Sequence, residues 1–384
     1  MRKRLKEFCD YISRGAAPDY VDESPYKVMN QATFSKGYID ESNVRFSSKA
    51  PEYAQIHKGD LLMASTGGGV LGKVAYFDKD ENDFYADSHV SILRNSKGIN
   101  SMKFLYYWFS TRYDEINATM VKGSTNQTEL QRNYLVNYEI DIPSLSVQQR
   151  IVSYLDDKTA KIDKAVSLLQ KKRDAYTRLK ASIINRAVTR GLNPNVKLKD
   201  SGVEWIGMIP EGWEVKAFKR FMNINNGCDY KHIIADEGYP VIGSGGVFEH
   251  ASQYLYDGEV LLLGRKGTID KPMYFKDKFW TVDTMFYCIP NKDVSCKYVY
   301  YQALIVPLLK YSTQTALPSM TQTSLYNISY CVPPLSEQRA IASYLDTHCT
   351  RIDHAISIVD KQIAAYTRLK RSLINEVVTG KRKV

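Results

Sequence analysis

A glycine-rich stretch near the N-terminus comes within one residue of a nucleotide-binding motif. Gly67, Gly72 and Lys73 stand where a phosphate-binding P-loop has two glycines and a lysine. In that loop a Ser or Thr hydroxyl after the lysine holds a Mg²⁺ ion, but Val74 occupies this position here. The residues that follow, Ala-Tyr-Phe, favour a strand, whereas a P-loop continues into a helix. An NTPase site at Gly67–Lys73 is one hypothesis; we prefer a turn between two strands that glycines hold open.

A second basic turn lies in the later half of the sequence. Arg265 and Lys266 follow an apolar run and are flanked by Gly264 and Gly267, which indicates a turn at a strand end. A guanidinium group at such a turn can enter the DNA major groove and bind O6 and N7 of guanine. The alternative is a solvated hairpin tip. Because the glycine-rich stretch occupies the corresponding place earlier in the chain, we interpret its lysine as a ligand of DNA phosphate rather than of ATP.

Recognisable catalytic or metal-binding motifs are absent from the sequence. It has no (Asn/Asp/Ser)-Pro-Pro-aromatic motif of an amino-methyltransferase, and no His, Cys or Asp cluster has metal-ligand spacing. The six cysteines are scattered without a C-x-x-C pair, which favours reduced thiols. No apolar run approaches the roughly 18–20 residues of a membrane span. We therefore expect a cytoplasmic protein that is not an enzyme and binds no metal or other cofactor itself.

The charge balance favours an acidic partner. The chain has 52 Lys and Arg against 42 Asp and Glu, a net charge of +10, together with 28 tyrosines. Cationic patches bind nucleic acids because phosphates release counterions when lysine and arginine approach. Charge alone is equally compatible with a basic protein whose lysines are simply solvated.

An internal repeat organises the chain. Residues 143–163, PSLSVQQRIVSYLDDKTAKID, return as PPLSEQRAIASYLDTHCTRID at 333–353. Residues 175–189, AYTRLKASIINRAVT, return as AYTRLKRSLINEVVT at 365–379. The offset is the same in both stretches, so the whole segment is duplicated without a gap.

Each copy predicts a long helix with an apolar seam at seven-residue spacing. Two matching seams in one chain most simply pack on each other as a coiled coil about 60 Å long. The alternative is that each helix covers its own globular domain. The seam residues are Leu155, Ile162, Leu169, Tyr176 and Ile183 in the first copy and Leu345, Ile352, Val359, Tyr366 and Leu373 in the second.

Weakly related regions of mixed β character precede the two helices. Gly59–Met63 parallels Gly258–Leu262, and Ala86–Ser88 parallels Val282–Thr284. The predicted layout is a first domain at 1–142, a first helix at 143–190, a linker at 191–213, a second domain at 214–332 and a second helix at 333–384.

At this point the residues match a known family. The chain resembles the specificity subunit of type I restriction–modification systems over nearly its whole length. The resemblance rests on the duplicated P-x-L-S-x-Q, I-x-S-Y-L-D and A-Y-T-R-L-K-x-S-x-I-N patterns. Further matches are SGVEWIGMIPEGWEVK (201–216), GYPVIGSGGVF (238–248), LLLGRKGT (261–268) and VDTMFY (282–287).

The resemblance implies a fold and a set of partners. The expected fold is α+β, with two mixed α/β target-recognition domains separated by two long antiparallel coiled-coil helices in a pseudo-two-fold repeat. Each domain would read one half of a bipartite site in double-stranded DNA. Two modification subunits carrying S-adenosylmethionine would methylate adenine N6, and two restriction subunits using ATP and Mg²⁺ would complete the complex. The family implies docking of a modification subunit around Gln148 and Gln338, at the helix starts.

The candidate DNA-binding residues are polar or basic residues in turns and in the segments that lead back to the helices. Single residues of these types also serve as ordinary turn hydrogen-bonders, which is the alternative for each. The candidates are Ser65, Thr66, Lys73, Ser88, His89, Asn126 and Gln127 in the first domain and Ser244, Gly245, Arg265, Lys266, Thr284 and Gln314 in the second.

The chain also departs from the family pattern in two places. The first helix copy has Val147-Gln148-Gln149 where the second has the family-like Glu337-Gln338-Arg339. The stretch 201–216 before the second domain has no counterpart before Met1. We therefore expect that the first domain lacks an edge segment or that the true start lies upstream.

Overall fold

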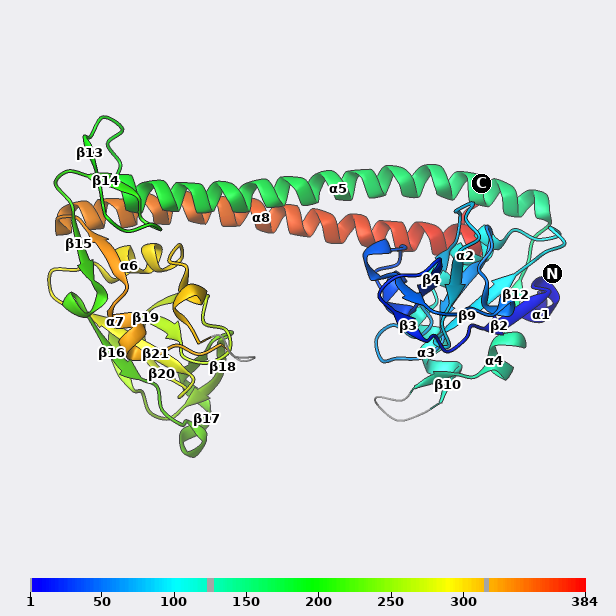
Figure 1. Cartoon of the computed structure of the whole chain (residues 1–384), viewed down its shortest axis with the longest axis horizontal. Helices are drawn as coiled ribbons and strands as arrows, with labels where there is room; N and C mark the ends of the chain where they lie inside the picture. Colours follow the sequence, from blue (N-terminus) through cyan, green and yellow to red (C-terminus); the bar gives the residue numbers. More distant parts are fainter. Residues whose placement is uncertain (1, 123–127, 314–317) are drawn as a thin grey trace. The chain divides into compact units, whose positions relative to one another are not determined.

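The chain divides into two compact units. The computed structural model describes residues 2–122, 128–313 and 318–384. The first unit comprises Met1–Leu169 and Gln362–Val384, and the second comprises Gln170–Lys361. Two long helices, α5 (Leu145–Arg190) and α8 (Leu335–Val378), each contribute one part to each unit (Figure 1). Each unit therefore joins one globular domain to a pair of helical segments that come from different halves of the sequence.

The first domain contains two four-stranded sheets. Its central strands form because short apolar runs such as Leu61–Ala64 are buried on both faces. In spatial order the sheets are β2 (Tyr11–Arg14), β9 (Val90–Arg94), β6 (Leu61–Ala64) and β7 (Val74–Tyr76), and β3 (Tyr20–Val21), β5 (Arg45–Ser47), β4 (Tyr26–Met29) and β8 (Phe84–Ala86). The other elements are β1 (Arg2–Arg4), α1 (Leu5–Phe8), η1 (Gln31–Phe34), η2 (Glu41–Asn43), η3 (Glu52–Ala54), α2 (Met102–Ser110), α3 (Tyr113–Thr119), β10 (Val121–Lys122), β11 (Glu129–Leu130), α4 (Arg132–Val136) and β12 (Glu139–Asp141).

The second domain is built around one six-stranded sheet. Its spatial order is β16 (Met222–Asn226), β21 (Met285–Pro290), β19 (Tyr256–Gly264), β20 (Met273–Thr281), β17 (Ile234–Gly243) and β18 (Gly246–Ala251). The other elements are β13 (Leu198–Asp200), β14 (Met208–Pro210), β15 (Glu214–Ala217), η4 (Phe218–Arg220), η5 (Lys231–Ile233), α6 (Cys296–Ala303), η6 (Leu308–Tyr311), α7 (Gln322–Tyr326) and β22 (Ser329–Val332).

The two domains share a pattern of strand pairing. In the first, β7 runs antiparallel to β6 while β8 runs parallel to β4. In the second, the single long strand β20 makes both kinds of pairing, antiparallel to β19 and parallel to β17. An antiparallel pair next to the long helix is also common to both, namely β1 with β12 and β15 with β22. The expectation that the first domain lacks an edge segment was therefore wrong for the edge strand, because β1 supplies it. The pair β13–β14 has no counterpart among the described residues of the first unit.

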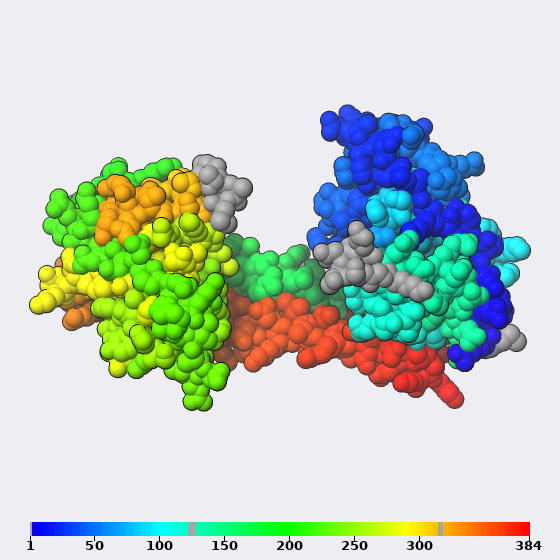
Figure 2. Space-filling model, turned by 90° about the horizontal axis from the view of Figure 1, so that it is seen from below, coloured from blue at the N-terminus to red at the C-terminus, as the bar shows by residue number. Residues whose placement is uncertain are grey.

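In the first unit, the end of α8 packs antiparallel against the beginning of α5. Leu155 and Ile162 of α5 share a buried core with Leu373 and Val377 of α8 and with the aromatic face of α2. The Lys370 Nζ atom lies 2.7 Å from the Asp163 carboxylate. In Figure 2 this end of α8, in red, lies at the surface beside the first domain.

In the second unit, the end of α5 packs in the same way against the beginning of α8. Val188 and Leu345 lie in the shared core, and Lys180 Nζ lies 2.7 Å from the Asp353 carboxylate. The two ion pairs are equivalent, because Asp163 corresponds to Asp353 and Lys180 to Lys370 in the repeat. In the first unit α5 supplies the aspartate and α8 the lysine, and in the second unit α8 supplies the aspartate and α5 the lysine. The antiparallel coiled coil and the pseudo-two-fold repeat are thus confirmed, and the hypothesis of two helices that each cover a separate domain was wrong.

Burial along the seam is uneven. Six of the ten seam residues are buried, whereas Leu169, Tyr176 and Ile183 are half-buried and Tyr366 is 38% exposed. A pair of helices covers only one side of a large tyrosine ring, which explains the exposure. No helix within the described ranges is apolar over a stretch long enough to cross a bilayer.

Candidate nucleic-acid interface

Three separate segments of the first domain are tied together at the end of β6. The Ser65 N–H donates to the His89 carbonyl at 2.8 Å, and the Leu130 N–H donates to the Ser65 carbonyl at 2.8 Å. The Gly67 N–H points to the Thr128 carbonyl at 3.4 Å. We call these segments, residues 65–67, 87–89 and 128–130, the loop frame of the first domain.

The second domain has the same loop frame, formed by residues 265–267, 282–284 and 318–320. The Arg265 N–H donates to the Thr284 carbonyl at 2.8 Å, and the Met320 N–H donates to the Arg265 carbonyl at 2.9 Å. The Gly267 N–H donates to the Pro318 carbonyl at 2.9 Å. Main-chain bonds thus hold the same three loops in both domains, while the side chains on them differ.

The hydrogen bonds also correct the alignment of the middle loop. The Val90 N–H donates to the Asp87 carbonyl, as the Met285 N–H does to the Val282 carbonyl. Asp87 therefore corresponds to Val282, one residue away from the pairing expected from the sequence. As a result, Thr284 occupies the place of His89 rather than that of Ser88.

Ser65 is a structural residue rather than a DNA ligand. Its side chain is fully buried, and its Oγ atom lies 2.6 Å from Ser91 Oγ. Its prediction as a DNA contact was wrong, because the Ser65 hydroxyl forms a hydrogen bond with the Ser91 hydroxyl inside the sheet.

The exposed face of the first loop frame carries a small polar cluster. Thr66 Oγ1 lies 2.7 Å from His89 Nδ1 and 3.3 Å from Gln31 Oε1. The His89 side chain is exposed, and Thr66, Gln31 and Ser88 are half-buried. Thus two of the predicted residues meet directly. Gln31 was missed because the connection at 30–44 has no recognisable motif, and nothing in the sequence signals its contact with the turn.

The buried carboxylate of Asp87 holds the loop that carries His89. Its Oδ1 atom accepts the His89 N–H at 2.8 Å, which fixes the loop on which the histidine stands. Burial raises the pKa of this carboxyl, and the hydrogen bond from the His89 N–H partly opposes the shift.

Lys73 does not belong to a nucleotide site. The strand β7 begins at Val74, directly after the lysine, so the helix that a P-loop requires is absent from this turn. The ammonium group donates to the Ser35 carbonyl at 2.5 Å and is half-buried. The NTPase hypothesis is therefore wrong for this stretch. The predicted phosphate contact would compete with an existing bond of the same lysine.

The second loop frame is more basic. Lys266 is exposed, and Arg265 is half-buried, with Nη1 3.3 Å from the Asp283 carbonyl. Ser244 and Gly245 lie in the turn between β17 and β18. The adjoining strand β17 contacts the frame, because the Ile242 carbonyl accepts the Val282 N–H at 3.4 Å. The candidates Asn126, Gln127 and Gln314 lie outside the described residues.

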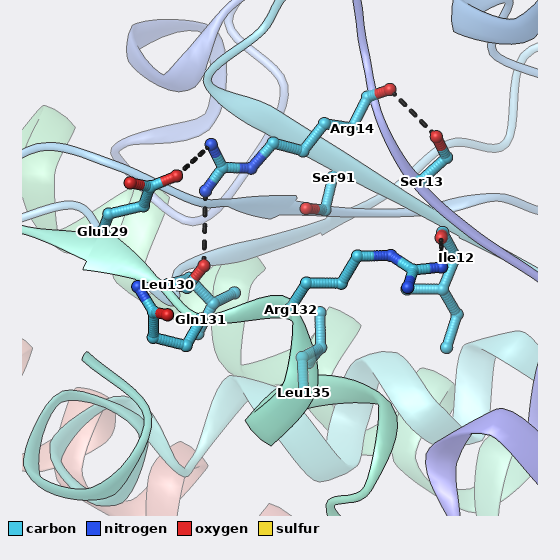
Figure 3. A pocket seen from close by; sticks show the side chains of 9 residues that line it. All are labelled: Ile12, Ser13, Arg14, Ser91, Glu129, Leu130, Gln131, Arg132 and Leu135. Atoms are coloured by element: carbon cyan, nitrogen blue, oxygen red, sulfur yellow. Dashed lines mark hydrogen bonds and ion pairs between the residues drawn. The ribbon is translucent and has the colours of Figure 1, made fainter. Parts of the chain in front are cut away.

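A cavity of about 490 Å³ borders the first loop frame (Figure 3). Arg14 lies on one side of it, 2.6 Å from Glu129 and 3.3 Å from the Leu130 carbonyl. Arg132 lies on another side, 3.3 Å from the Ile12 carbonyl, and is exposed. The lining residues are Ile12, Ser13, Arg14, Ser91, Glu129, Leu130, Gln131, Arg132 and Leu135. Two guanidinium groups against one carboxylate favour an anionic ligand, and a DNA phosphate fits that requirement.

Gln148 and Gln338 hold each domain to its helix. The Oε1 atom of Gln148 accepts the Ser101 N–H at 2.8 Å, and that of Gln338 accepts the Ser295 N–H at 2.9 Å. Each amide nitrogen donates to the carbonyl of the proline five residues earlier, at 3.0 and 2.8 Å. Both side chains are 1% exposed. These two side chains were therefore wrongly predicted as contacts for a partner, because they satisfy buried main-chain groups instead.

A second duplicated contact lies further along the helices. The Tyr107 hydroxyl donates to Asp156 at 2.6 Å, and the Tyr301 hydroxyl donates to Asp346 at 2.7 Å. In both cases a lysine four residues before the tyrosine pairs with the same carboxylate. Burial, reinforced by the neighbouring carboxylate, raises the pKa of both tyrosines. We call these duplicated glutamine and aspartate contacts the domain clamp.

The first departure from the family pattern also has a local explanation. Glu337 accepts a hydrogen bond from Trp213 Nε1 at 3.0 Å, and Trp213 ends the linker that precedes the second domain. The first helix copy has Val147 at the matching position.

Replacing Gln148 by alanine is expected to lower the free energy of unfolding by about 1–3 kcal/mol. The substitution leaves the Ser101 N–H and the proline carbonyl buried without their partner, which has a cost of that order. Chemical denaturation followed by tryptophan fluorescence measures the change. Gln149 is exposed, so Gln149→Ala is the matched control and should stay within about 0.5 kcal/mol of the parent. Equal effects of the two substitutions would contradict the clamp.

Comparison with known proteins agrees with this architecture. The family model for the type I restriction modification DNA specificity domain matches twice, at residues 1–171 and 210–359. A chain from a solved structure that describes complex assembly and conformational transition of the type I R-M system superposes with a TM-score of 0.70 at 16% identity. The match covers 98% of this chain and 97% of the other.

Two relatives with similar sequences are also named as specificity subunits. The MjaX protein of Methanocaldococcus jannaschii, named as a type I restriction enzyme specificity subunit, is 24% identical over all of this chain and 93% of its own length. The type I restriction enzyme MjaVIII specificity subunit of the same organism is 23% identical over 74% of this chain and 71% of its own.

Proposed function

Since the chain belongs to the family of type I restriction–modification specificity subunits, we propose that each of its target-recognition domains reads one half of a bipartite DNA site. The observation that carries this proposal is the duplicated loop frame. The main chain holds three loops in the same arrangement in both domains, yet a neutral cluster stands on one frame and a basic pair on the other. Equal frames with unequal side chains suit two readers of different sequences.

We further propose that α5 and α8 set the spacing between the two half-sites. The reciprocal ion pairs and shared cores support a coil with one fixed register in each unit. With a fixed register, the number of residues in the coil would set the distance between the two half-sites, because helix length is proportional to residue number.

The chemistry of the complex belongs to the partners in this proposal. The chain acts as a non-catalytic subunit. Two modification subunits would bind S-adenosylmethionine and methylate adenine N6, and two restriction subunits would use ATP and Mg²⁺. With Gln148 and Gln338 buried, docking at the helix starts would involve exposed neighbours such as Gln149 and Arg339.

The salt dependence of DNA binding distinguishes a DNA-reading subunit from the alternative, a helical scaffold that binds only proteins. The complex with its modification subunits is expected to show a steep fall of log binding constant with log salt. Substituting the exposed Lys266 by alanine should reduce that slope by about 0.9 if the lysine contacts one phosphate. Filter binding or fluorescence anisotropy at several salt concentrations measures both values.

Lys276→Ala provides the matched control for this experiment. Lys276 is an exposed lysine further along β20 that pairs with Glu259 at 3.1 Å. Its removal should leave the slope unchanged. A flat slope for the parent complex would contradict the proposed function, and equal slopes for the two lysine variants would show that Lys266 contacts no phosphate.

A further inference from the structure

We infer that Gln31, Thr66 and His89 form a base-reading cluster in the first domain, and that the base edge it fits is that of adenine in the major groove. The inference rests on the proposed function and adds a specificity-determining residue, Gln31, from a different loop. We call the three side chains the Gln31 cluster.

The hydrogen bonds within the cluster fix which atoms donate. The Thr66 hydroxyl has one proton and two neighbours, Gln31 Oε1 at 3.3 Å and His89 Nδ1 at 2.7 Å. An amide oxygen can only accept, so the hydroxyl proton goes to Gln31. A neutral His89 then donates from Nδ1, and in that tautomer its Nε2 atom is an acceptor. The cluster therefore offers the amide N–H groups of Gln31 as donors and two acceptors, Gln31 Oε1 and His89 Nε2.

The backbone holds the cluster in place before any ligand arrives. Asn30 accepts the Ala32 N–H at 2.8 Å and so fixes the start of the loop that carries Gln31. Gly67 has a φ of +93°, and a Cβ atom there would lie 2.8 Å from the Gln31 amide nitrogen. Only glycine allows the amide to lie against this turn. Side chains that are ordered in advance lose less entropy on binding.

The pattern of donors and acceptors matches adenine. The major-groove edge of adenine presents N7 as an acceptor and the N6 amino group as a donor, and a glutamine amide satisfies both. Guanine presents two acceptors, O6 and N7, which would face the acceptors of the cluster.

The second domain places different chemistry on the equivalent positions. Lys266 stands in place of Thr66, Thr284 in place of His89, and Arg265 in place of the buried Ser65. The basic donors Arg265 and Lys266 suit guanine. The Gln31 cluster should therefore affect only one half-site, and the other half-site serves as an internal control.

The test uses the full chain in complex with its modification subunits. Binding is measured on duplex DNA randomised at every position of the site. In Gln31→Ala, the preference for adenine at one position of the first half-site should fall by about 5- to 150-fold, the range for one bidentate base contact. In Gln31→Glu, which removes the donor and keeps the shape, the preference at that position should move to cytosine, whose N4 amino group donates to a carboxylate. Gln362→Ala, at an exposed glutamine of α8, is the control and should change neither half-site.

Three results would overturn the inference. They are an unchanged base preference in both Gln31 variants, a uniform loss across the whole first half-site, and a preference at the affected position for a base other than adenine in the parent complex. Failure of the proposed function looks different, since the parent complex would then show no sequence preference in either half-site.

Discussion

Exchanging residues 1–142 for the first domain of another specificity subunit is expected to replace one half of the recognised sequence and leave the other half unchanged. The physical reason is that the domain clamp is duplicated. Ser101 and Tyr107 meet Gln148 and Asp156 with the same geometry that their counterparts show in the second unit. A domain that carries the matching serine and tyrosine should therefore seat on α5 in the same way. Sequencing of the sites methylated by the hybrid complex measures the result.

The clamp supplies the control for this exchange. A hybrid whose incoming domain lacks the tyrosine equivalent to Tyr107 should bind more weakly, but with the same bases preferred. A change in both half-sites, or in neither, would contradict the modular reading of the DNA.

Lengthening both helices by seven residues is expected to displace the preferred spacing between the half-sites. The insertions belong near residue 170 of α5 and residue 361 of α8, where the two units meet along the chain. Such a pair of insertions keeps Asp163–Lys370 and Lys180–Asp353 in register. Seven residues add about 10 Å of helix, close to the length of three base pairs. Binding to sites with a series of spacer lengths should show an optimum about three base pairs longer and weaker binding to the original site.

An insertion in α5 alone is the comparison for this experiment. It cannot keep both ion pairs and both cores in register, so it should destabilise the protein rather than select a longer spacer. If the paired insertion left the preferred spacing unchanged, α5 and α8 would not set the distance between the half-sites.

The fold was largely predictable from the sequence because its main feature is a local, repeated pattern. An exact offset between two seams predicts two equivalent helices, and the family resemblance adds that they pair in antiparallel orientation. The domain topology was less accessible. The single strand β20 makes both pairings that β7 and β8 make separately in the first domain. The middle loops of the two domains align one residue away from the sequence match, as their hydrogen bonds show.

The candidate site was only partly predictable. The basic turn at Arg265 and the pairing of Thr66 with His89 lie in segments with recognisable turn signals. Ser65 and Gln148 have the same polar character, yet both are buried and serve main-chain or side-chain groups inside the protein. A sequence cannot distinguish a polar residue that faces a ligand from one that satisfies a buried neighbour. Arg14 and Gln31 reach the loop frame only through tertiary contacts.

Methylome sequencing of cells with and without this chain tests most directly whether it reads a bipartite site, provided that the modification subunits are present in both. We expect N6-methyladenine at one bipartite motif, with two defined halves separated by a spacer of fixed length, and loss of that methylation when the chain is removed. Identical methylation in both cells, or dependence on the chain at a continuous motif without a spacer, would contradict this expectation.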